Sequence, residues 1–163
     1  MPWVPLLSAV VGAVIATSSA ALLDRFRWRR ERHDRLIGVR RALYGDYLEC
    51  LSQARNAFRS LSRNLEAAAS EREQMARDSF APCYGIRYQM SITASKDVFE
   101  ASEIAFRRLR GFRDLAAAGT LASDEAYVGG RVLYDDALSR LRAAMRQDLD
   151  ADRVSATPAR LQR

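Results

Sequence analysis

Histidine and lysine are nearly absent from this chain of 163 residues, in which His33 is the only histidine and Lys96 the only lysine. A single histidine excludes, or nearly excludes, a histidine acid–base relay, a Ser-His-Asp triad and a di-iron bundle with paired ExxH motifs. The signatures GxxxxGK[ST] and GxGxxG are also missing, so no standard nucleotide-binding loop is present. We therefore predict a protein that is not an enzyme and has no cofactor.

Cysteine is scarce as well, because Cys50 and Cys83 are the only two. Neither belongs to a CxxC motif or to a set with metal-ligand spacing. In a cytoplasmic domain both should be reduced. The sequence predicts that they act as small, buried apolar residues and that no metal is bound.

Charge is missing from residues 3–23, which read WVPLLSAVVGAVIATSSAALL. As a helix this segment would be roughly 30 Å long, the thickness of the hydrocarbon core of a bilayer. Trp3 suits the membrane–water boundary and Pro5 suits a first helical turn. We predict a transmembrane anchor over residues 1–23, with a buried core helix as the alternative. A cleaved signal peptide is disfavoured, since no basic residue precedes the apolar run.

Arginines follow the apolar run immediately. Residues 24–41, which we call the collar, hold eight arginines and three acidic residues, a net charge of +5 in a chain whose total is +6. The positive-inside rule then places the N-terminus outside and the C-terminal domain in the cytoplasm of a bacterial inner membrane. We expect anionic lipid headgroups to be contacted by Arg25, Arg27, Arg29, Arg30, Arg32 and Arg35.

Residues 42–163 carry 18 basic and 17 acidic residues and are therefore nearly neutral. We therefore interpret the basic excess mainly as a signal of membrane topology. Nucleic-acid binding remains the alternative function.

Small residues recur at every fourth position of the predicted anchor, at Ser8, Gly12, Ala16 and Ala20. This spacing lets two transmembrane helices approach closely and would permit a homo-oligomer. Chance is the competing explanation, because alanine and serine are abundant throughout the chain.

Helical signals dominate after the collar, and no stretch alternates like a strand. Between residues 34 and 69 the apolar positions repeat every 3.5 residues, the pattern of a coiled coil or helical bundle: Tyr47, Leu51, Ala54, Phe58, Leu61, Leu65 and Ala68. We predict an all-α fold in which the transmembrane helix continues into an antiparallel bundle of three to four helices over residues 42–150. Residues 151–163 form a predicted disordered tail.

Five positions indicate where helices begin or end. Ser70 with Glu73 matches a capping box for a helix from Glu71, although one helix continuous from residue 34 to 91 stays open. The other signals are a break at Pro82, an N-cap at Ser95, a C-terminal glycine at Gly119 and an N-cap at Ser123. The last two helices have predicted buried faces at Val98, Ala101, Ala105, Leu109, Phe112 and Ala116, and at Tyr127, Val128, Tyr134, Leu138, Leu141, Met145 and Leu149.

The segments RRERHDR (29–35) and RRALYGDYLECL (40–51) resemble a loose group of uncharacterised single-pass proteins of high-GC actinobacteria. In that group an arginine cluster precedes Arg-x-x-Tyr-x-x-aromatic-Leu, and Arg41, Tyr44, Tyr47 and Leu48 occupy those positions here. The resemblance implies an architecture and no known activity. We accordingly predict a membrane-tethered helical interaction or scaffold protein with an unknown protein partner. The alternative is a membrane-anchored nucleic-acid-binding module that uses the juxtamembrane arginines.

Overall fold

A computed structural model describes the backbone of residues 3–63 and 66–156, and the side chains of residues 28, 31–32, 34–63 and 66–151. The chain is mostly helical in this part and contains no strand there, which confirms the all-α prediction. The helices are α1 (Trp3–Leu61), α2 (Ala69–Phe80), α3 (Pro82–Thr93), α4 (Lys96–Ala117) and α5 (Glu125–Ala156).

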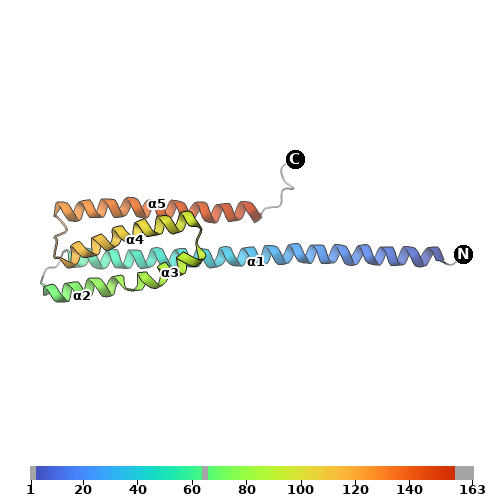
Figure 1. Ribbon diagram of the computed structural model, residues 1–163, viewed down its shortest axis with the longest axis horizontal. Coiled ribbons are helices and arrows are strands. Elements are labelled where there is room, and N and C mark those ends of the chain that lie inside the picture. Colours follow the sequence, from blue (N-terminus) through green and yellow to red (C-terminus); the bar gives the residue numbers. More distant parts are fainter. Residues whose placement is uncertain (1–2, 64–65, 157–163) are drawn as a thin grey trace. The chain divides into compact units, whose positions relative to one another are not determined.

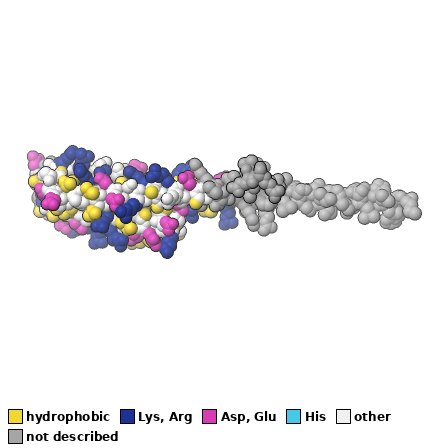
Figure 2. Space-filling view, turned by 90° about the horizontal axis from the view of Figure 1, so that it is seen from above, with side chains coloured by type: hydrophobic (Ala, Val, Ile, Leu, Met, Phe, Trp, Pro, Cys, Tyr) yellow, Lys and Arg dark blue, Asp and Glu magenta, His cyan; other side chains and the backbone are white. Residues whose placement is uncertain are grey.

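The chain divides into two units, of which one includes Met1–Gly38 and the larger one is Val39–Thr157. Within the larger unit the chain passes back and forth. The C-terminal half of α1, the pair α2–α3, α4 and α5 lie side by side and alternate in direction (Figure 1). The predicted helical bundle is therefore confirmed. Basic and acidic side chains are interspersed over the face of this unit seen in Figure 2, as expected for its nearly neutral charge.

Aromatic side chains connect the layers of the bundle. The ring of Phe58 on α1 lies 6.3 Å from Phe80 on α2 and 6.4 Å from Phe112 on α4, measured between ring centres. Phe112 in turn lies 4.6 Å from Tyr127 on α5, and Phe80 lies 4.8 Å from Phe106 on α4. All five residues are buried. Rings at these separations contribute about 0.5–1.5 kcal/mol per pair beyond their hydrophobic burial, so this cluster is a principal source of packing energy.

The 3.5-residue pattern is correct through Leu61, because Tyr47, Leu51, Ala54 and Phe58 are buried together with it. Its extension to residue 69 is wrong: α1 ends at Leu61 and Ala68 is exposed. Leu65 lies outside the described residues.

At the end of α1 the N–H of Arg63 donates to the carbonyl of Ser60, three residues back, at 3.1 Å, so the α-helical pattern stops there. The carbonyl of Ser62 accepts the backbone N–H of Ala122, in the α4–α5 connection, at 3.0 Å. A contact distant in sequence therefore holds the chain just past the end of α1.

The predicted break at Pro82 is confirmed. α2 ends at Phe80, and Pro82 is the first residue of α3, where its missing N–H costs nothing. The predicted capping box is wrong, because α2 begins at Ala69 and Ser70 lies inside its first turn. The backbone N–H of Arg72 donates to the carbonyl of Ala68 at 2.9 Å, which places the first helical bond earlier than a cap at Ser70 would, and the Arg72 side chain donates to the carbonyl of Ala67 at 2.7 Å.

The ends of α4 agree with the sequence. Ser95 occupies the N-cap position with extended backbone angles, although its side chain makes no capping hydrogen bond. Gly119 has a φ of +79°. Its N–H donates to the carbonyl of Ala116 at 3.1 Å, and the N–H of Thr120 donates to Leu115 at 3.0 Å. This pair of bonds is a Schellman motif, which satisfies the last carbonyls of the helix and requires a residue tolerant of positive φ.

Two predictions about α5 need correction. The helix begins at Glu125, so the residue at its N-terminus is Asp124 and not Ser123. The Asp124 carboxylate accepts the backbone N–H of Leu121 at 2.9 Å, which holds the connection in a tight turn. Val128 is exposed, since only one of two adjacent residues can face the core there and Tyr127 does so.

Among the residues described with their side chains, no helix is both long and apolar enough to cross a membrane. The predicted anchor at residues 1–23 lies outside those residues, so the membrane assignment stays a prediction. The predicted tail falls largely outside them as well.

Candidate functional site

The predicted site residues fall mostly in the part of the chain whose side chains are not described. This is true of the small-residue stripe Ser8, Gly12, Ala16 and Ala20 and of Arg25, Arg27, Arg29 and Arg30. Arg32 and Arg35 are described, and both are exposed. Arg35 lies 3.9 Å from Glu31 one turn away, a solvated ion pair. Trp28 lies one turn before Arg32 and is 75% exposed. The described part of the collar before Val39 therefore presents an exposed tryptophan beside exposed arginines.

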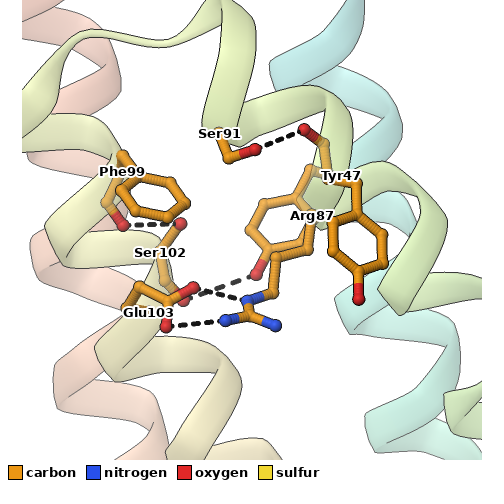
Figure 3. A network of polar contacts seen from close by, with 7 residues as sticks. Tyr47, Arg87, Ser91, Phe99, Ser102 and Glu103 are labelled. Carbon is orange, nitrogen blue, oxygen red and sulfur yellow. Dashed lines mark hydrogen bonds and ion pairs between the residues drawn. The ribbon is translucent and has the colours of Figure 1, made fainter.

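Within the bundle, an ion pair between Arg87 of α3 and Glu103 of α4 forms the centre of a polar network (Figure 3). Arg87 donates to both carboxylate oxygens, one of them at 2.8 Å, and these bonds raise the pKa of Arg87. Its guanidinium lies over the Phe106 ring, 4.7 Å from the centre. The hydroxyl of Tyr47 donates to the carbonyl of Ser102 at 3.4 Å. Because the two charges neutralise each other, the network ties α1, α3 and α4 together rather than offering a reactive group.

A second polar cluster joins α1 to α5. The Tyr44 hydroxyl donates to Asp148 at 2.6 Å, and Arg40 lies 3.6 Å from the same carboxylate oxygen. Arg40 also donates through Nε to the carbonyl of Thr93 at 3.1 Å. Burial and then the hydrogen bond to Asp148 raise the pKa of Tyr44. The hydroxyl therefore stays protonated at neutral pH and serves as a fixed donor.

A third polar cluster consists of arginines and surrounds a small cavity between the end of α1 and α5. The cavity has a volume of about 130 Å³. Three of the arginines follow one another at four-residue spacing, two on the last turns of α1 and one just past its end, and the fourth comes from α5. We call this the arginine pocket, and it is lined by Arg55, Arg59, Arg63 and Arg131, with Phe112 and Tyr127 as its aromatic wall.

The charges of the arginine pocket are only partly balanced. Arg55 pairs with Asp135 at 3.0 Å and lies over the ring of Tyr134, 5.9 Å from its centre. The side chains of Arg59, Arg63 and Arg131 are exposed and form no hydrogen bond or ion pair with any residue that the structure describes. Three uncompensated guanidinium groups around one hollow create a positive potential there.

Tyr127 shows how closely these arginines converge. Burial raises the pKa of Tyr127, while the positive charges of Arg59, Arg131 and Arg55 act on it in the opposite direction. Three cations from two helices are thus within electrostatic reach of one hydroxyl. In the sequence, Arg55, Arg59 and Arg63 fall between the apolar positions of the 3.5-residue pattern and carry no other signal. Nothing in the sequence places Arg131, 68 residues after Arg63, beside them.

The two cysteines meet in the core. Cys50 on α1 and Cys83 on α3 are both buried, as the sequence predicted, and their sulfur atoms lie 2.7 Å apart with both thiols free. Burial and the contact with Cys50 raise the pKa of Cys83. A thiol held in its neutral form is a poor nucleophile, so the pair behaves here as core packing.

No group of three or more histidine, cysteine, aspartate or glutamate side chains suited to a metal ion occurs among the described residues. Comparison with protein families, with curated proteins and with solved structures finds no match to this chain.

Proposed function

We propose that this protein is a membrane-tethered helical interaction protein, held in a bacterial inner membrane by residues 1–23, with its helical bundle on the cytoplasmic side. The observation that carries the proposal is the uncharged run of 21 residues followed at once by a collar of net charge +5. Both lie within the single helix α1. A central arginine in such a segment would cost on the order of 3 kcal/mol, so the complete absence of charge over this length favours a lipid environment.

The described part of the collar supports this role. Trp28 is largely exposed to solvent, next to Arg32 and Arg35. Tryptophan and arginine together are typical of the headgroup region, where the indole ring sits at the interface and the guanidinium contacts lipid phosphate. In the bundle, the paired charges of Arg87 and Glu103 act as structural ties. These features favour a scaffold whose contacts with partners matter more than chemistry.

Membrane fractionation of cells expressing the full chain tests the proposal. We expect the protein to stay in the membrane pellet after washes with high salt and with alkaline carbonate. Val11→Arg should reduce the pelleted fraction strongly. Val132→Arg is the matched control, because it introduces the same charge at an exposed position of α5, outside the anchor and the collar, and should leave the pelleted fraction unchanged.

Release of the wild-type protein by salt alone would mean that only charge holds it, and the proposed anchor would be wrong. Release by nuclease treatment would instead favour the nucleic-acid-binding alternative, in which phosphate contacts by the collar arginines dominate and weaken steeply with salt.

A further inference from the structure

We propose that the arginine pocket binds a phosphate group, either inorganic phosphate or the phosphate of a phosphorylated molecule. The pocket belongs entirely to the larger unit, so this inference goes beyond membrane tethering and does not depend on it.

The unpaired charge of the pocket is the first reason. Arg55 already has Asp135 as its counter-ion, whereas Arg59, Arg63 and Arg131 form no ion pair among the described residues. Like charges held close together repel one another, and an anion among them removes that repulsion. A phosphate dianion compensates more of this charge than a single carboxylate does.

The chemistry of arginine is the second reason. Each guanidinium presents donors in a planar fork that matches the oxygens of a phosphate bidentately. Arg59 lies on α1, Arg63 lies two residues past its end, and Arg131 lies on α5. The aromatic contact between Phe112 and Tyr127 and the ion pair between Arg55 and Asp135 hold α1, α4 and α5 around the pocket. The packed bundle therefore places the backbones of these arginines around one cavity.

The cavity is large enough for a phosphate group. Its volume of about 130 Å³ is several times the roughly 10–15 Å³ that one water molecule needs on the same measure. The rest of a phosphorylated molecule would extend over the exposed surface beside the pocket.

A lipid headgroup presents the same phosphate chemistry to these arginines as a soluble phosphate does. The experiment therefore tests inorganic phosphate and anionic vesicles separately.

Titration of the full chain in detergent micelles with inorganic phosphate tests the proposal, at constant ionic strength set with sodium chloride. Calorimetry or the broadening of the phosphate signal in phosphorus NMR would report binding. We expect saturable binding with a dissociation constant at or below about 1 mM. Arg59→Gln combined with Arg131→Gln should weaken it about tenfold or more, because each arginine supplies charge-assisted hydrogen bonds.

The matched control is Arg107→Gln combined with Arg108→Gln, which removes the same charge from exposed positions on α4 outside the pocket. Its phosphate affinity should stay within about twofold of wild type, because long-range charge effects are largely screened at moderate salt. Circular dichroism checks that both variants are folded. If the first variant fails this check, Arg59→Lys keeps the charge but loses the planar fork, and it should weaken binding severalfold.

Three results would overturn the proposal. The first is the absence of saturable phosphate binding by the wild-type chain. The second is an equal loss of affinity in the pocket and control variants, which would mean that the protein attracts anions through its overall charge. The third is binding to anionic vesicles that depends on Arg59 and Arg131 while inorganic phosphate does not bind, which would mean that the pocket contacts a membrane surface and does not bind phosphate itself.

Discussion

Replacing either Tyr44 or Tyr134 by phenylalanine removes one hydroxyl group, but the two hydroxyl groups have different surroundings. Both side chains are buried. The Tyr44 hydroxyl donates to the carboxylate of Asp148 at 2.6 Å, whereas the Tyr134 hydroxyl is buried with no hydrogen-bond partner among the described residues. We therefore expect the two substitutions to change the free energy of unfolding in opposite directions.

The magnitudes follow from the hydrogen bonds. A hydrogen bond to a charged group contributes about 1.5–3 kcal/mol, so Tyr44→Phe should destabilise the protein by that amount. We expect the lower end of the range, because Asp148 keeps Arg40 at 3.6 Å and is not left without a partner. A buried hydroxyl without a hydrogen bond costs about 1–3 kcal/mol, so Tyr134→Phe should be stabilising by about 1 kcal/mol. The ring of Tyr134, over which Arg55 lies, is retained in this variant.

Urea unfolding of the full chain in detergent micelles, followed by circular dichroism, measures both changes. The difference between the two variants should be about 2–4 kcal/mol. The slope of the unfolding transition should stay unchanged, since neither substitution alters the surface exposed on unfolding by much. If Tyr134→Phe were as destabilising as Tyr44→Phe, the Tyr134 hydroxyl would have a hydrogen-bond partner and the reasoning would be wrong.

Three further predictions concern the core, a helix end and a thiol. Phe58→Ala should cost about 3–5 kcal/mol in the same unfolding measurement, because it opens a cavity between the rings of Phe80 and Phe112; a cost below 1 kcal/mol would refute the packing described. Gly119→Ala should cost about 1–2 kcal/mol, since φ is +79° and the new methyl group would lie 2.9 Å from the Arg72 guanidinium; no loss would show that α4 ends differently. Burial raises the pKa of the Cys83 thiol in the folded protein. The contribution of the neutral thiol to the free energy of unfolding is therefore complete below the pKa of an unfolded cysteine, about 8.5, and is lost as the pH rises above that value. Alkylation at pH 8.5 should accordingly be at least about tenfold slower in the folded than in the urea-unfolded chain, and equal rates would contradict the burial.

Most of the fold could be predicted because its signals are local. The spacing of Tyr47, Leu51 and Phe58 identifies the buried face of α1, and Pro82 and Gly119 mark helix ends through their own backbone chemistry. The wrong predictions concern helix ends, where contacts distant in sequence also act. Just past the end of α1, the carbonyl of Ser62 accepts the N–H of Ala122, a contact that no window around residue 62 could reveal.

The candidate site was not predictable for the same reason. Arg59 and Arg63 look like solvated residues in the sequence, and their role changes only when Arg131 is brought beside them by the return of α5. The contact between Tyr44 and Asp148 spans 104 residues and is equally hidden in the sequence. To predict a charge cluster that combines residues 55–63 with Arg131, one must know which residues of α5 lie beside the end of α1. The arginines of the collar are contiguous in the sequence and could be recognised directly.

The central claim is that residues 1–23 cross a membrane with the bundle on the cytoplasmic side, and the most direct test is labelling of single cysteines in intact cells. The native cysteines are replaced by serine at Cys50 and alanine at Cys83, and one new cysteine is placed either before Trp3 or at the exposed Ser139 of α5. A membrane-impermeant maleimide should label the N-terminal cysteine in intact cells and the cysteine at position 139 only after permeabilisation. The reverse labelling, or labelling of neither position before permeabilisation together with a protein absent from the membrane pellet, would contradict the proposed topology.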